Sequence, residues 1–121
     1  MAVRITSMVV RVTAIGVLIL GALLWTGNND QLKSVHMLFG MLIVLGLWGL
    51  GITQAIRGGS PVLAVVAVVL GGVAFWFGTN QESFSPNSNH WVIQVMHLLI
   101  GLGAIGLAEV SAARYHKVPK A

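Results

Sequence analysis

The stretch 34–56 reads SVHMLFGMLIVLGLWGLGITQAI and lies between Lys33 and Arg57. It contains no charged side chain and is longer than the about 20 residues that a helix needs to cross a bilayer. Lipid offers no hydrogen-bond partners to an open backbone, so a run of this kind crosses a membrane as a helix. We therefore predict a membrane-spanning helix over 34–56.

Three further stretches have the same character. Apolar runs of similar length cover 8–27, 61–79 and 90–113. Across its 121 residues the chain is 56% hydrophobic and 8% charged, which leaves too little polar surface to cover a water-soluble globule. We expect an all-α fold, an integral membrane four-helix bundle, with a single transmembrane domain over 1–121. The absence of cysteine excludes disulfides and thiolate metal sites.

Basic side chains gather on one side of this arrangement. They are Arg4, Arg11, Arg57, Arg114, Lys117 and Lys120. Lys33 is expected on the opposite side, together with Asp30 and Glu82. Cytoplasmic ends carry the excess of lysine and arginine, so we expect both termini in the cytoplasm and a multi-pass protein of the bacterial inner membrane. Basic residues next to helix ends match an anionic lipid leaflet, and we expect no nucleic-acid partner.

The connections between the four stretches are read from their polar residues. The stretch 79–89, which contains Pro86, is predicted to be an exposed loop outside the cytoplasm. The short segment 57–61 joins the second and third stretches, and its brevity makes them neighbours. Pro61 suits the first position of the third helix.

Two motifs recur in the same order along the chain. The pattern G-x-x-x-W-x-G-x-N covers 21–29 and recurs at 72–80. The pattern H-x-L-x-G then follows in the second stretch and again in the fourth. These ordered matches predict an internal repeat, 1–57 and 61–121, in which each half is a helical hairpin.

Each copy of H-x-L-x-G places one histidine inside an apolar helix. The histidines are His36 and His97. Histidine costs free energy in lipid unless it is paired or ligated, and two imidazoles at matching depth can hold a haem iron from both faces. We predict that His36 and His97 ligate one haem near the extracytoplasmic face. Without cysteine, coordination and packing alone would hold it.

Neighbouring residues on the same helical faces suit a flat macrocycle. Gly40 and Gly101 follow the histidines by one turn, where a side chain would collide with a porphyrin edge. Lys33 and Gln94 precede the histidines by three residues, and we expect them to hold the haem propionates. A stripe of small residues continues the face of the fourth helix at Ala104, Ala108 and Ala112.

The same residue types also occur in membrane helices that bind no haem. Small residues serve close helix packing, and a lone histidine can link helices by a hydrogen bond without any cofactor. Sulfur beside imidazole can bind Cu(I), although neighbours in sequence point about 100° apart on a helix. The methionines concerned are Met37, Met41 and Met96. A copper-handling protein is therefore one alternative.

Three titratable residues lie outside this histidine pair. Glu109 is the one acidic residue inside a predicted span, and we expect an ion pair with Arg57 or Arg114, which Gln54 is able to join. A proton-carrying role toward a quinone is the alternative for Glu109. His90 is expected to anchor the outer interface, and His116 is expected to be solvated.

Histidines on the second and fourth of four membrane helices, each followed by glycine one turn on, resemble the small membrane cytochromes of the cytochrome b561-like kind. The residues that carry the resemblance are His36, Gly40, His97 and Gly101. It implies non-covalent haem b and one-electron transfer, often between a quinone and a partner redox protein. Two-haem members have a second histidine pair that is missing here, so we expect one haem.

We expect an electron-transfer protein, because a six-coordinate iron leaves no open position for oxygen chemistry. No set of acid and base groups predicts an enzyme; quinone-linked redox activity is compatible with the chain. The alternatives are a small accessory subunit of a larger respiratory or photosynthetic complex and a haem-handling protein. The expected partners are lipid, a quinone, and a larger redox complex or further copies of the chain.

Overall fold

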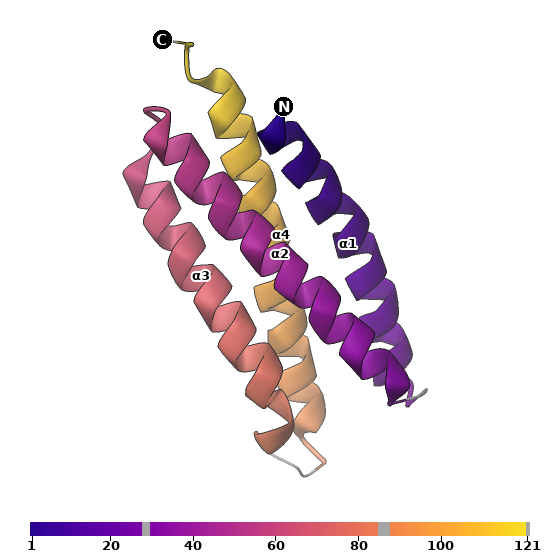
Figure 1. Cartoon of the computed structure of the whole chain (residues 1–121). Helices are drawn as coiled ribbons and strands as arrows, with labels where there is room; N and C mark the ends of the chain where they lie inside the picture. Colours follow the sequence, from indigo (N-terminus) through magenta and orange to yellow (C-terminus); the bar gives the residue numbers. More distant parts are fainter. Residues whose placement is uncertain (28–29, 85–87, 121) are drawn as a thin grey trace.

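The computed structural model describes residues 1–27, 30–84 and 88–120, which form four antiparallel helices (Figure 1). The helices are α1 (Ala2–Trp25), α2 (Gln31–Ile56), α3 (Pro61–Asn80) and α4 (His90–Lys117), and a 3-10 turn, η1 (Gln81–Ser83), follows α3. Each long helix is apolar enough to cross a membrane, so the bundle suits a lipid bilayer. The described residues contain no strand, and the all-α, four-helix prediction is confirmed.

The helix ends differ from the predicted ones at several places. α1 begins at Ala2, six residues before the predicted start, and α4 continues to Lys117. α3 continues to Asn80 and is followed by η1, so the first part of the predicted loop 79–89 is helical; residues 85–87 of that loop lie outside the described residues. The predictions followed apolar side chains, whereas backbone hydrogen bonds continue through the polar ends of a helix.

Both termini and the α2–α3 turn lie at one end of the bundle, and the other two connections lie at the opposite end (Figure 1). We call the first end the terminal half, and it holds residues 1–14, 43–71 and 104–120. The other described residues, which include His36 and His97, form the histidine half.

The tightly packed core lies in the terminal half. It is built from Val3, Val10, Leu47, Leu50, Ala67, Ala104, Ala108 and Ala112. Small residues let helix backbones approach each other closely, which is how membrane helices gain packing energy. The predicted alanine stripe of α4 therefore serves helix packing here. In the histidine half, Phe77 is the one buried side chain among the described residues.

Gln54 connects α2 to α3 at the terminal end. Its side chain is fully buried, donates through Nε2 to the carbonyls of Gly51 (3.0 Å) and Ser60 (2.7 Å), and accepts from the Ser60 amide (2.9 Å). Ser60 caps α3 by accepting from the Leu63 amide, and Pro61 begins the helix as predicted. Gln54 thus stabilises the turn and does not join the Glu109 ion pair.

Candidate functional site

His36 of α2 and His97 of α4 lie side by side in the histidine half. Their ring centroids are 6.1 Å apart and their planes are inclined by 57°. Both side chains are half-buried, and the Nδ1 atom of each ring is buried without a hydrogen-bond partner among the described residues. Buried polar atoms without a partner are rare in folded proteins and call for a ligand, an ion or water. The structure thus brings together the two residues that the repeated motif predicted.

A glycine of the preceding helix lies behind each imidazole. A Cβ atom added at Gly21 of α1 would lie 3.3 Å from Cε1 of His36, and one added at Gly78 of α3 would lie 3.0 Å from Cε1 of His97. Both glycines belong to the repeated G-x-x-x-W-x-G-x-N motif, but Gly21 is its first glycine and Gly78 its second. Sequence reasoning noted the motif and missed this contact.

Phe77 of α3 lies next to the His97 ring, with the two ring planes nearly parallel. The two rings are stacked, with centroids 6.2 Å apart and planes within 8°. Phe84 packs against Phe77 at 5.6 Å and against Trp76 at 5.5 Å, so an aromatic cluster leads from His97 toward the end of the bundle. The sequence analysis assigned no role to Phe77. The one feature that could have indicated its contact with His97 is its position next to Gly78 of the repeated motif.

Gly40 and Gly101 leave open space beside the imidazoles. A Cβ atom added at either position would meet no atom within 4 Å, apart from the helix's own backbone and adjacent residues. Glycine in a helix interior lowers helix stability by about 1 kcal/mol relative to alanine. In the described bundle no neighbouring helix packs closely against Gly40 or Gly101, so helix packing does not offset this cost. Gly49, Gly72 and Gly106 have equally open surroundings. The space at Gly40 and Gly101 matters because it adjoins the two histidines.

The two predicted propionate-binding residues have different surroundings. Lys33 forms an ion pair with Glu82 of η1, and both side chains are substantially exposed. This pair connects the beginning of α2 to the end of α3 across the histidine half. Gln94 is half-buried one turn before His97. A role for these residues toward a cofactor stays a prediction.

The other two histidines lie away from the pair. Nδ1 of His90 is 3.2 Å from the carbonyl oxygen of Phe84, so His90 ties the start of α4 to the segment after η1. His116 is exposed in the terminal half, where its ring meets the edge of Tyr115.

The predicted partner of Glu109 is wrong. Glu109 accepts from Nε and Nη2 of Arg11, at 2.8 and 2.7 Å, which connects α4 to α1. Arg57 instead lies over the ring of Tyr115, with Cζ 4.4 Å from the ring centroid. Arg57 and Arg114 were predicted because they lie near the same expected end of the bundle as Glu109, but the antiparallel return of α4 beside α1 places Arg11 at the level of Glu109.

The described residues limit the kinds of metal site that this chain offers. Among the described residues, no three His, Asp or Glu side chains lie close enough together to hold one ion. These residues therefore form no zinc site of the kind that uses three or four such ligands. A haem takes no more than two ligands from the protein. The methionines proposed for copper lie on the outer surface of the bundle, each 45% or 46% exposed: Met37, Met41 and Met96.

Comparisons of the chain with protein-family models, with curated proteins and with solved structures find no match. We therefore infer a function from the residues and their geometry.

Proposed function

We propose that this chain is a membrane protein that binds one haem b through His36 and His97 and transfers single electrons. The observation that carries the proposal is the 6.1 Å separation of the two ring centroids, together with a buried, unpartnered Nδ1 on each ring. Axial nitrogens about 4 Å apart across an iron put imidazole centroids about 6 Å apart. The separation in the described bundle agrees with that requirement.

The surroundings of the pair support the same function. Gly40 and Gly101 provide open space on the faces that carry the histidines. The packed core is confined to the terminal half, and Phe77 is the one buried side chain of the described histidine half. A large planar group between the helices would supply the apolar contacts that this half of the bundle lacks.

The chemistry of the site follows from its two ligands. Haem supplies a one-electron couple, and two imidazoles would make it six-coordinate. His36 and His97 would hold the iron, and Phe77 and Gly78 would fix the orientation of the His97 ring. Because groups that touch a metal ligand tune the properties of the metal, Phe77, which stacks on His97, would affect the reduction potential.

An absorption spectrum of the detergent-purified full chain, supplied with haem, tests the proposal. We expect the sharp reduced α band of low-spin, six-coordinate haem. His36→Ala and His97→Ala should each remove that band, whereas His116→Ala should leave it unchanged. Circular dichroism shows whether each variant keeps its helices.

Addition of free imidazole separates a ligand role from a folding role. Imidazole enters the space left by the missing side chain, so it should restore the low-spin spectrum of His36→Ala and of His97→Ala. A chain that binds no haem, or a spectrum that is the same in all three histidine variants, would contradict the proposal.

A further inference from the structure

A polar hollow of about 320 Å³ lies between α1 and α4 in the terminal half, away from the histidine pair. Residues three or four apart share one face of a helix. The residues that line the hollow are spaced in this way on α1 and again on α4, so each helix contributes one face. The polar side chains that line it are Arg4, Ser7, Arg11, Glu109 and His116. The polar side chains therefore form two facing stripes at a place where membrane helices usually present apolar surface.

The hollow carries a surplus of positive charge. Its one carboxylate, Glu109, accepts from Nε and Nη2 of Arg11, one donor to each oxygen. Arg4 has no ion-pair partner among the described residues. The exposed ring of His116 lies on the opposite wall and adds no negative charge. An anionic group would therefore be attracted to the Arg4 end.

Ser7 gives a second, independent sign of a ligand. Its side chain is 7% exposed and lines the hollow, yet Oγ has no hydrogen-bond partner among the described residues. A buried hydroxyl without a partner destabilises the fold, because it has lost its hydrogen bonds to water. A ligand with acceptor oxygens would satisfy both Ser7 and Arg4.

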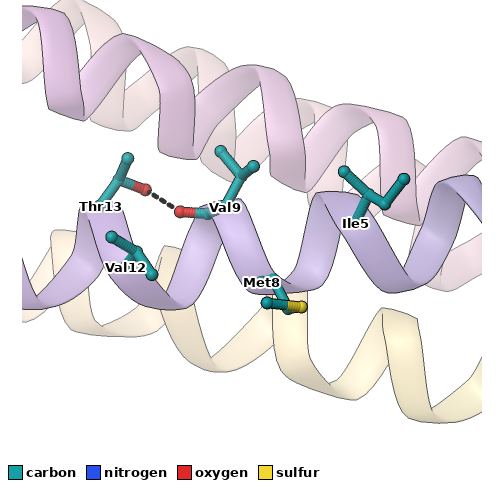
Figure 2. A pocket seen from close by; sticks show the side chains of 5 residues that line it. All are labelled: Ile5, Met8, Val9, Val12 and Thr13. Atoms are coloured by element: carbon teal, nitrogen blue, oxygen red, sulfur yellow. Dashed lines mark hydrogen bonds between the residues drawn. The ribbon is translucent and has the colours of Figure 1, made fainter.

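An apolar hollow of about 360 Å³ lies on the surface of α1 (Figure 2). It is lined by Ile5, Met8, Val9, Val12 and Thr13, and Met8 also lines the polar hollow. The Thr13 hydroxyl donates to the carbonyl of Val9 at 2.7 Å, as the dashed line shows, so it is not available to a ligand. This hollow thus offers apolar contact only.

We propose that the two hollows together bind one anionic phospholipid. The phosphate would lie between Arg4 and Ser7, and an acyl chain would pass over Met8, which lines both hollows, and along Ile5 and Val12. Arg4 is in the first turn of α1, and Val12 is about 12 Å further along the helix at 1.5 Å per residue. This order of charge and apolar surface agrees with a lipid whose headgroup is at the terminal end and whose chain points toward the middle of the bilayer.

Native mass spectrometry of the full chain tests the proposal. The protein is released from mixed micelles that contain equal amounts of phosphatidylglycerol and phosphatidylcholine. We expect bound phosphatidylglycerol to exceed phosphatidylcholine about fivefold, the effect of one basic residue near an anionic lipid. Arg4→Gln should reduce this ratio about fivefold, to about one. Lys117→Gln is the matched control, because this exposed residue of α4 does not line the hollow, and it should keep the ratio.

Two further measurements separate a lipid site from other causes. Ser7→Ala should lower the preference for phosphatidylglycerol without lowering thermal stability in neutral detergent, because it removes an unsatisfied hydroxyl. Millimolar inorganic phosphate should not displace the lipid. Equal binding of the two lipids, equal losses in Arg4→Gln and Lys117→Gln, displacement by phosphate alone, or a quinone bound as tightly as the lipid would each overturn the proposal.

Discussion

Each imidazole of the pair is confined between the other imidazole and a glycine. On the His36 side the glycine is Gly21, and on the His97 side it is Gly78, where Phe77 adds a stacked ring. The ring of His97 therefore has less freedom to turn than that of His36. A change on the His97 side should affect the site more strongly.

Gly78→Ala tests this confinement. The added Cβ would lie 3.0 Å from Cε1 of His97, so the ring must shift. We expect haem affinity to fall about tenfold, as is usual when contacts behind a metal ligand change. Haem titration followed by absorption measures this.

Gly72→Ala is the matched control, because a Cβ atom at this position meets nothing within 4 Å beyond the helix itself. It should leave haem affinity unchanged and raise helix stability by up to about 1 kcal/mol. Equal affinities for the two variants would show that the glycine behind His97 has no effect on the ligand.

The residues of the site differed in how well they could be predicted. His36 and His97 were found because a motif of five residues occurs twice, and a polar residue in an apolar helix stands out. Phe77 and Gly78 were not found, because their contact with His97 depends on how α3 is rotated about its own axis. Apolar residues lie all round α3, so its sequence does not say which face meets α4.

At the scale of elements, the α2–α3 turn depends on one amide side chain. Gln54 is buried and makes three hydrogen bonds to Gly51 and Ser60. Gln54→Leu keeps the volume of the side chain but removes its hydrogen bonds to the amide and carbonyl groups of Ser60. We expect the free energy of unfolding to fall by about 1–3 kcal/mol, which is the usual cost of leaving a buried group unpaired.

Thermal unfolding in detergent, followed by circular dichroism, compares Gln54→Leu with Thr53→Val. Thr53 is exposed on the adjacent position of α2, and its substitution should change stability by less than about 0.5 kcal/mol. If both variants unfold at the temperature of the unchanged chain, the side chain of Gln54 does not stabilise the turn.

At the scale of the whole molecule, the number and type of helices followed from composition and run length. A bilayer requires helices of about 20 apolar residues, and four such runs were visible. The pairing of Arg11 with Glu109 was not predictable in the same way, because it depends on α1 and α4 lying side by side at the same level. The internal duplication stays a prediction.

The orientation of the bundle in the membrane is the last prediction. Both termini and the α2–α3 turn lie at one end, which also carries most of the basic residues (Figure 1). The excess of lysine and arginine marks the cytoplasmic side, so this end should face the cytoplasm. The chain has no cysteine, so one introduced cysteine reports its own position without background. In intact cells, a membrane-impermeant maleimide should label Ser88→Cys, at the start of the segment before α4, and should label Lys120→Cys only after permeabilisation. Labelling of Lys120→Cys alone in intact cells would reverse the orientation, and it would move the proposed phospholipid to the outer leaflet.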